Sequence, residues 1–366
     1  MTVFRSLGAP FGGSVVAAPG VPLGALVGAP LGAASGALVV AAFGALFGVR
    51  RQPAFALAGG SPDPLGARDL SVRAARGDFV APGGGSRREA PARPHARAEW
   101  LENRLTERDW AILETLFRVR LATSGQIQRL HFFGLSQAAS IRKRTLKRLT
   151  EWRAIIAPVR RIGGPSGGSQ QRIYSLDPAA QQLMELRWGI DPQRRRSADP
   201  TVSPRLATHM LTVAELYVRC VEMSRSGALD LLEFQVEPDC WWPLQTGDYL
   251  KPDAYLCIGV PGSDFVDHWW IEIDLGTIRA PHMRRKFARY ADFAANGGTG
   301  PGGVLPGIVV TAPHDTRRTG LKQIVTRLGT TARQLIQVIP FDSAVTVLAS
   351  HAANLPNPST ERHDQS

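Results

Sequence analysis

Two segments of the chain alternate between apolar and polar residues, the pattern of a β-strand with one buried face. The first runs from Tyr249 to Ile258, and the second runs from Phe265 to Leu275 with Asp267 as the one exception. The stretch 259–262 between them supplies the glycine and proline of a turn. The pattern therefore predicts a β-hairpin, which is followed by a helix from Pro281 to about Ala294.

Carboxylates gather on one face of the second predicted strand. Glu272 and Asp274 share the face opposite the apolar residues, because successive side chains of a strand point to opposite sides. Folding the hairpin about its turn brings Asp253 roughly opposite Glu272, and directly opposed cross-strand residues lie close together. We therefore expect Asp253, Glu272 and Asp274 to converge at the open end of the hairpin.

Three converging carboxylates repel one another, so ionising all of them is costly unless a cation is present. Carboxylate oxygens without nearby thiolates or imidazoles suit magnesium or manganese. The sequence therefore predicts a Mg²⁺ or Mn²⁺ site formed by Asp253, Glu272 and Asp274. Acids on the exposed face of an amphipathic strand are also common without any function, so the prediction depends on the joint pattern.

Residues 100–187 show helical periodicity followed by a short hairpin. Thr106 and Asp109 resemble a capping box that opens a first helix, a second helix follows Thr123, and a third runs from about Ser136 to Trp152. Residues 155–162 and 172–176 then form a small hairpin around a glycine-rich loop. This is the element order of a winged helix-turn-helix domain, whose third helix reads DNA.

Basic residues lie on the predicted third helix and its hairpin. We expect them to contact DNA phosphates, although exposed Lys and Arg on a helix are also common without this role. The predicted DNA-binding residues are Lys143, Arg144, Lys147, Arg160, Arg161 and Arg172.

The C-terminal part, residues 205–350, alternates between helical and strand patterns. A helix is expected over 206–223, a strand over 231–236, then the hairpin and its helix, and a short strand over 307–311. A helix around 321–335 and strands near 337–341 and 345–348 complete the pattern. The core order is helix, three strands, helix, strand (αβββαβ), and the whole chain is expected to be α+β or α/β.

Composition favours a polyanionic partner. The chain has 366 residues, a net charge of +12 and a pI near 10.4, so double-stranded DNA is the leading candidate and an anionic membrane surface is the other. Three scattered cysteines indicate neither a disulfide framework nor a zinc site, which fits a reducing cytoplasm. No GxxxxGK[ST] phosphate loop and no His-x-His pair is present, which argues against an ATP-driven motor and a metal-dependent tyrosine relaxase.

Three segments are expected to lie outside the folded domains. Residues 1–95 are rich in Ala, Gly and Pro and are predicted to be disordered or a misassigned upstream extension, although 31–49 is long enough to leave a membrane anchor open. Residues 188–204 are basic and broken by proline, as in a linker. Residues 351–366 are predicted to be a disordered tail.

The order of elements, with Pro252-Asp253 on one strand and Glu272-x-Asp274 on the next, resembles the PD-(D/E)xK nuclease superfamily. The additional N-terminal winged helix, His209 and Glu215 on the first helix of the C-terminal part, and the segment IEIDLGT are more specifically similar to the replication-relaxation family of plasmids and mobile elements. This resemblance implies binding of an origin and its relaxation by metal-dependent nicking.

The chain departs from the superfamily pattern at Asp274, where a lysine is expected two residues after the acid. Lys286 on the following helix could supply the missing charge, with Asp274 as an extra metal ligand or general base. Alternatively, the site is inactive, and the chain is a non-catalytic origin-binding or transcriptional regulatory protein. Replication or mobilisation proteins are the implied partners, and a homodimer is left open.

Overall fold

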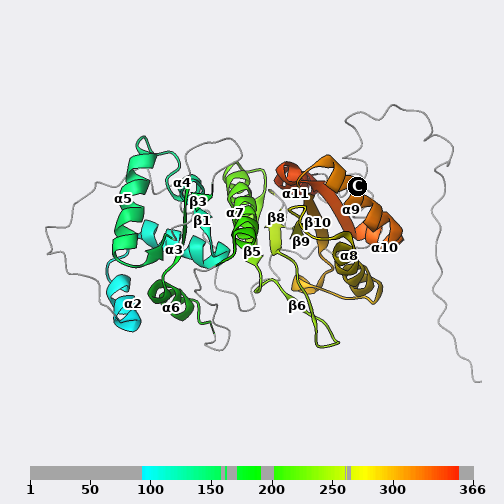
Figure 1. The fold of residues 1–366 in the computed structure, drawn as a ribbon, viewed down its shortest axis with the longest axis horizontal. Helices are drawn as coiled ribbons and strands as arrows, with labels where there is room; N and C mark the ends of the chain where they lie inside the picture. The colour runs from blue at the N-terminus through cyan, green and yellow to red at the C-terminus, as the bar shows by residue number, and fades with distance from the viewer. Residues whose placement is uncertain are drawn as a thin grey trace, which may run out of the picture.

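The computed structural model describes residues 93–157, 161–162, 171–190, 202–259, 261 and 265–353. Within these residues, a mainly helical unit and a sheet-containing unit lie side by side along the long axis of an elongated molecule (Figure 1). Our predictions for residues 1–92, for Arg160, for most of the linker and for most of the tail lie outside the described residues. None of the described helices is long and apolar enough to span a membrane.

The helical unit contains the predicted sequence of three helices and a hairpin. Its elements are α2 (Pro94–Glu102), α3 (Glu107–Val119), β1 (Ala122–Thr123), α4 (Ser124–His131), α5 (Ala138–Glu151), β2 (Ile155–Ile156), β3 (Arg161–Ile162), β4 (Gln171–Leu176) and α6 (Pro178–Arg187). Strand β4 pairs antiparallel with β1, β2 and β3. The predicted capping box of Thr106 and Asp109 begins α3, and Thr123 with Gln126 forms a second one at α4.

The second unit is a five-stranded mixed sheet with helices on both faces. Its elements are α7 (Pro204–Arg225), β5 (Asp230–Val236), β6 (Trp242–Pro243), β7 (Tyr249–Leu250), β8 (Ala254–Gly259), β9 (Val266–Ile273), α8 (Ala280–Ala295), β10 (Gly307–Ala312), α9 (Asp315–Arg327), α10 (Thr330–Leu335), β11 (Ile336–Pro340) and α11 (Ala344–Ala353). The strand order is β11-β10-β9-β8-β5. Strand β8 is antiparallel to β5 and β9, whereas β10 is parallel to β9 and β11. The protein is therefore mixed α+β.

The central strand β9 is buried along its whole length. Trp269, Ile271 and Ile273 pack into the core that contains α7 and α11, whereas Trp270 packs into a second core with α8 and α9. The predicted alternation of two faces is therefore confirmed. The alternative in which Glu272 lies on the exposed face of an amphipathic strand is wrong, because α8 packs on that side and Glu272 is 2% exposed.

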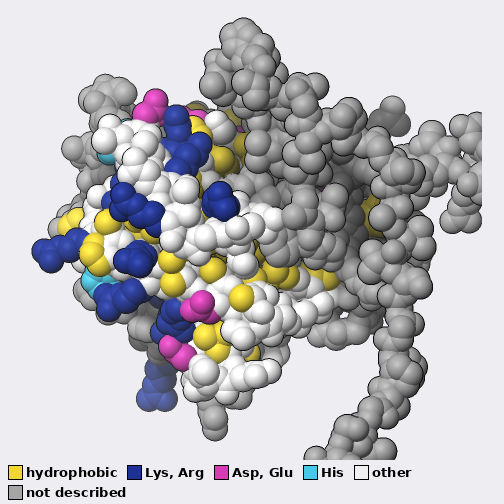
Figure 2. Space-filling view, turned by 90° about the vertical axis from the view of Figure 1, so that its right-hand side faces the viewer, with side chains coloured by type: hydrophobic (Ala, Val, Ile, Leu, Met, Phe, Trp, Pro, Cys, Tyr) yellow, Lys and Arg dark blue, Asp and Glu magenta, His cyan; other side chains and the backbone are white. Residues whose placement is uncertain are grey.

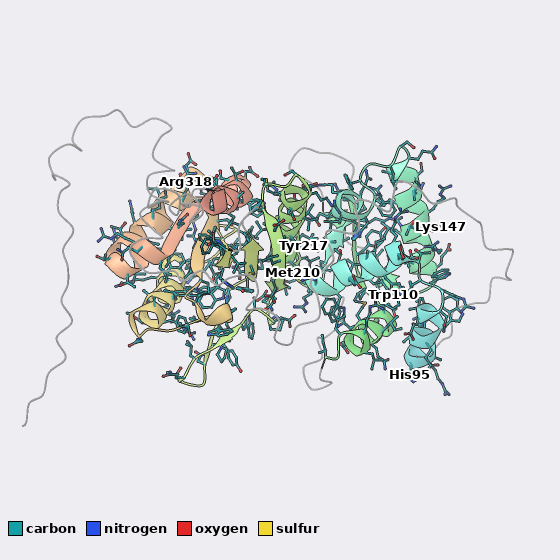
Figure 3. The ribbon with its side chains drawn as sticks, turned by 180° about the vertical axis from the view of Figure 1, so that it is seen from behind. His95, Trp110, Lys147, Met210, Tyr217 and Arg318 are labelled. Carbon is teal, nitrogen blue, oxygen red and sulfur yellow. The ribbon has the colours of Figure 1, made fainter. Side chains whose placement is uncertain are left out.

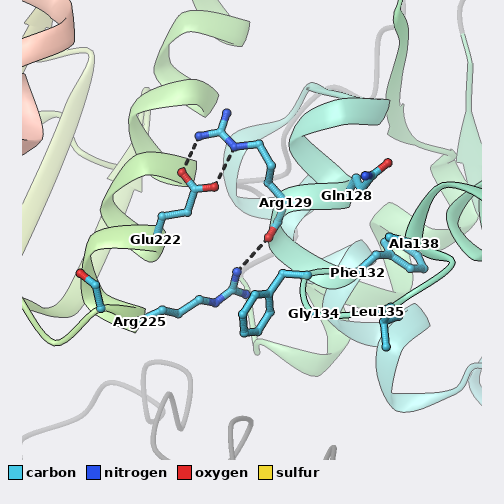
Figure 4. Close-up of a pocket in the computed structure, with 10 residues that line it drawn as sticks. Gln128, Arg129, Phe132, Gly134, Leu135, Ala138, Glu222 and Arg225 are labelled. Carbon is cyan, nitrogen blue, oxygen red and sulfur yellow. Dashed lines mark hydrogen bonds and ion pairs between the residues drawn. The ribbon is translucent and has the colours of Figure 1, made fainter.

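The two units share one continuous hydrophobic core, which includes residues of α3, α4, α6 and α7 together with the sheet. Polar contacts reinforce this interface. Arg129 of α4 binds Glu215 (Nη1–Oε1 2.7 Å). Arg129 also binds Glu222 (Nε–Oε1 2.8 Å), and Arg225 donates to the carbonyl of Arg129 at 2.9 Å (Figure 4). Arg129, Glu222 and Arg225 border a surface pocket of about 500 Å³ that also includes the exposed Phe133.

Three predicted elements differ from the structure. The expected strand 345–348 is part of α11, because Val345 and Leu348, three residues apart, both pack into the core that contains α7. The expected helix 321–335 is two helices separated at Gly329, whose φ is 99°. The expected strand 249–258 is divided into β7 and β8, and Pro252 between them has no amide hydrogen to continue the pairing.

Candidate functional site

Asp253 and Glu272 lie opposite each other at one end of the β8–β9 pair, as predicted. Ala254 is paired with Ile271, so the register places Asp253 across from Glu272. The backbone amide of Asp253 donates to the carbonyl of Ile271 at 2.9 Å, and the amide of Ile273 donates to Asp253 Oδ2 at 2.6 Å. The backbone of β9 therefore fixes the Asp253 carboxylate beside that of Glu272.

Lys286 of α8 joins this pair of carboxylates. Its Nζ forms an ion pair with Glu272 Oε2 and lies 3.7 Å from Asp253 Oδ1. The helix stripe of Met283, Phe287 and Tyr290 packs against the sheet, and Lys286 follows Met283 by three residues, so it projects on nearly the same side. A lysine from the neighbouring helix thus contacts both acids.

Burial and charge act in opposite directions on these groups. Burial raises the pKa of Glu272 to about 8, although Lys286 and Tyr290 partly offset this rise. Burial alone would raise the pKa of Asp253, but Lys286, His209 and the amide of Ile273 outweigh it and lower that pKa. Burial alone would lower the pKa of Lys286, but the two carboxylates raise it. The site is therefore a protonated lysine beside two acids of unequal strength.

Two further side chains complete the cluster, and neither was predicted from the sequence to belong to it. Nε2 of His209, on α7, lies 3.5 Å from Asp253 Oδ1, and the hydroxyl of Tyr290 donates to Glu272 Oε1 at 2.6 Å. The position of Tyr290, four residues after Lys286, could have indicated a shared helix face. The contact of His209 depends on how α7 crosses the sheet, for which the sequence carries no local signal.

Asp274 makes a different contact from the one we expected. Its side chain is fully buried and accepts hydrogen bonds from Arg317 of α9, with Nε–Oδ2 2.6 Å and Nη2–Oδ1 3.0 Å. Arg317 also donates to the carbonyl of Ile278 at 2.6 Å. Both Asp274 oxygens are thus engaged by an arginine, and this bidentate pair anchors the loop between β9 and α8. Arg317 was not among the residues predicted from the sequence.

Glu215 is also away from the two acids. It binds Arg129, Arg219 and Gln126 at the interface between α4 and α7. Its role in the structure is therefore to join the two units.

The predicted DNA-binding residues on α5 lie on its exposed side. Lys143, Arg144 and Lys147 are exposed, whereas Thr145 and Leu149 face the core. Arg172 is exposed on β4 and is paired in register with Arg161 of β3. Helix α5 and strand β4 therefore present basic residues outward.

The donor set can be compared with the needs of a divalent metal. Among the residues that the structure describes, no group of three or more His, Cys, Asp or Glu side chains is arranged to hold a metal ion. Mg²⁺ needs fewer protein ligands, because it is usually held by one or two carboxylates together with waters and substrate phosphates. The opposed carboxylates of Asp253 and Glu272 fit that requirement.

Comparisons with known proteins place the chain in a family. No curated protein and no solved structure matches it. The family model described as replication-relaxation matches residues 113–308, more than half of the chain. The match runs from α3 to β10 and includes Asp253, Glu272 and Lys286. The chain therefore belongs to the replication-relaxation family, which points to a role in the replication of plasmids or mobile elements.

Proposed function

We propose that this protein is a Mg²⁺-dependent DNA endonuclease that binds an origin of plasmid or mobile-element replication and relaxes it by nicking one strand. The observation that carries this proposal is the contact of Lys286 with both Asp253 and Glu272. Two acids and a lysine around one point are the groups that the PD-(D/E)xK nuclease pattern brings together, and here the lysine comes from a helix.

The helical unit, in this proposal, is a winged helix-turn-helix domain that directs the chain to DNA. The order of α3, α4 and α5 followed by the β2–β4 hairpin supports this assignment. The α5 side chains Lys143, Arg144 and Lys147 would contact duplex DNA, with Arg172 and Arg161 at the wing. Charge reversal of the three α5 residues should weaken DNA binding and reduce its dependence on salt.

The sheet unit, in this proposal, is a PD-(D/E)xK nuclease-like domain. The order α7, β5, β8, β9, α8, β10 supports this assignment and matches the αβββαβ order expected from the sequence. Asp253, directly before β8, lies across from Glu272 on the antiparallel strand β9, and backbone hydrogen bonds fix their separation.

Each side chain of the cluster would have a separate task. Asp253 and Glu272 would hold Mg²⁺, which when bound polarises the scissile phosphate and lowers the pKa of a water molecule. Lys286 would balance the negative charge that develops on the phosphate oxygens. His209 and the amide of Ile273 orient Asp253, and Tyr290 orients Glu272.

Nicking of supercoiled plasmid DNA that carries the cognate origin tests this function. The wild type should convert it to open circles with Mg²⁺ and not with EDTA, whereas Asp253→Ala, Glu272→Gln and Lys286→Ala should be inactive while they still bind DNA. Asp292→Ala is a matched control, because Asp292 is an exposed acid on α8. Activity of the Asp253 and Glu272 variants equal to that of the wild type would refute the proposed site.

A non-catalytic origin-binding or regulatory role is the second candidate. The observation in its favour is that Lys286 contacts both acids, so its positive charge offsets part of their repulsion without a metal. Absence of nicking with any divalent metal, together with normal DNA binding, would establish this second role.

A further inference from the structure

The helices α8, α9 and α10 concentrate positive charge outside the cluster of Asp253, Glu272 and Lys286. Residues 279–335 contain ten Lys and Arg residues but only two acids, which gives a net charge of +8 in a chain whose total is +12. The three helices pack against one another and cover one side of the sheet. Most of the excess charge of the protein is therefore carried by one group of neighbouring helices.

Only some of these basic residues are neutralised within the protein. Arg317 pairs with Asp274, Arg318 with Asp315, Arg289 with Asp248, and Lys286 with the two acids of the candidate site. In contrast, Arg284, Lys322 and Arg327 are exposed and have no ion-pair partner among the described residues. Unpaired exposed cations on adjacent helices suit a polyanion, because phosphates can replace the missing carboxylate partners.

This basic surface lies at the opposite end of the molecule from the helix proposed to read DNA. Figure 1 shows α5 at one end of the long axis and α9 and α10 at the other. Seen from behind, Lys147 of α5 and Arg318 of α9 lie toward opposite ends (Figure 3). Figure 2 looks at the α9–α10 end, where Lys and Arg side chains gather on the described part of the surface with few acids between them.

We propose that the exposed basic surface of α8, α9 and α10 binds the sugar-phosphate backbone of a second segment of duplex DNA, so that a single chain holds two DNA segments at once. Figures 1 and 3 place the α5 surface and this surface at opposite ends of the long axis, so the proposal assigns a separate duplex segment to each surface. The proposal rests on the proposed DNA binding by α5 and does not depend on nicking. Binding through phosphates predicts no sequence preference at the second surface.

A bridging experiment in EDTA tests the proposal without any cleavage. A biotinylated duplex of arbitrary sequence is fixed to beads, protein is added, and capture of a second, fluorescent duplex is measured. Two variants carry the same change in charge at opposite ends: Arg284→Glu, Lys322→Glu and Arg327→Glu on α8 and α9, and Lys143→Glu, Arg144→Glu and Lys147→Glu on α5. Both variants should fold, because Glu is a good helix former and all six positions are exposed.

The wild type should capture the fluorescent duplex, and each triple variant should bind single duplexes but capture about tenfold less of the second one. Loss of three phosphate contacts should also reduce the slope of log affinity against log salt by about 2.7 for the altered surface. A variant with all six changes should lose both binding modes.

Three results would overturn the proposal. Undiminished capture by the α8–α9 variant would mean that bridging occurs through two α5 surfaces of a dimer. Complete loss of DNA binding by the α5 variant at low salt would mean that α8–α10 does not bind DNA. Binding of the α5 variant to phosphatidylglycerol vesicles but not to duplexes, abolished by the α8–α9 changes, would assign the surface to an anionic membrane.

Discussion

The pair of Asp274 and Arg317 distinguishes a structural acid from a catalytic one. The Asp274 carboxylate is fully buried, and Arg317, whose side chain is 17% exposed, is the cation bound to it. Removal of one partner from a buried ion pair leaves an uncompensated charge and costs about 3–5 kcal/mol of unfolding free energy. Arg317→Ala should lie at the upper end of that range, because the remaining carboxylate has no access to solvent.

Asp274→Ala should cost less, about 3 kcal/mol, because Arg317 retains the carbonyl of Ile278 and some solvent contact. The double variant should be more stable than Arg317→Ala alone, because it also removes the uncompensated carboxylate, so the coupling energy between the two positions should exceed about 3 kcal/mol. Urea unfolding of the wild type, the two single variants and the double variant measures this coupling. A coupling energy below about 0.5 kcal/mol would refute the assignment.

Asp274→Asn tests the chemical role separately from stability. Asparagine keeps the shape and one acceptor for Arg317, so a structural Asp274 predicts nicking close to the wild-type rate in this variant. A metal ligand or general base at this position predicts loss of nicking, as expected for Asp253→Asn. An inactive but fully folded Asp274→Asn protein would therefore restore the role that the sequence suggested.

Other predictions concern titration and hydrogen bonding. Because burial raises the pKa of Glu272 to about 8, nicking at low Mg²⁺ should increase as pH rises to about 8, and higher Mg²⁺ should shift this profile to lower pH as the metal competes with the proton. A pH dependence of nicking that stays the same at all Mg²⁺ concentrations would contradict competition between the metal and the proton at Glu272. Burial, with Arg225 and Arg108, lowers the pKa of His131 to about 3, so the unfolded state binds a proton that the folded state does not. The free energy of unfolding should therefore fall by up to about 1.4 kcal/mol per pH unit as the pH drops below ~6.5. The urea midpoint of His131→Gln should not show this pH dependence. Tyr290→Phe, which removes the hydrogen bond to buried Glu272, should cost about 1.5–3 kcal/mol in urea unfolding, and an unchanged midpoint would exclude that contact.

The parts of the site that the sequence predicted are those set by local geometry. Asp253 and Glu272 lie across from each other because the turn of the hairpin sets the antiparallel register of the two strands. The position of Lys286 beside the apolar stripe of α8 likewise follows from the helical repeat. Each of these two predictions needs only the repeat of one strand or helix and one short turn, so neither requires knowledge of the rest of the fold.

Asp274 was predicted to share the face of Glu272 because the two-residue repeat of the strand was assumed to continue to residue 274. Strand β9 ends at Ile273, and the amide of Asp274 instead donates to the carbonyl of Thr311 on β10 at 3.1 Å. Its carboxylate then meets Arg317, which lies 43 residues later in the sequence. No periodicity in the sequence connects two residues that meet only because β10 packs beside β9 and leads into α9.

Placement of the lysine on α8 makes the proposed chemistry depend on helix packing. A lysine two residues after Glu272 would directly follow the end of β9, whereas Lys286 reaches the acids only while Met283, Phe287 and Tyr290 remain packed on the sheet. Arg317 joins the end of β9 to the carbonyl of Ile278, two residues before α8 begins, so it stabilises the connection that positions this helix. The side chain that replaced the expected lysine, Asp274, is therefore part of the structure that holds Lys286 in place. Asp274, which stands where the nuclease pattern has a lysine, helps to anchor α8 through Arg317. Helix α8 in turn carries Lys286, which supplies the positive charge beside the two acids.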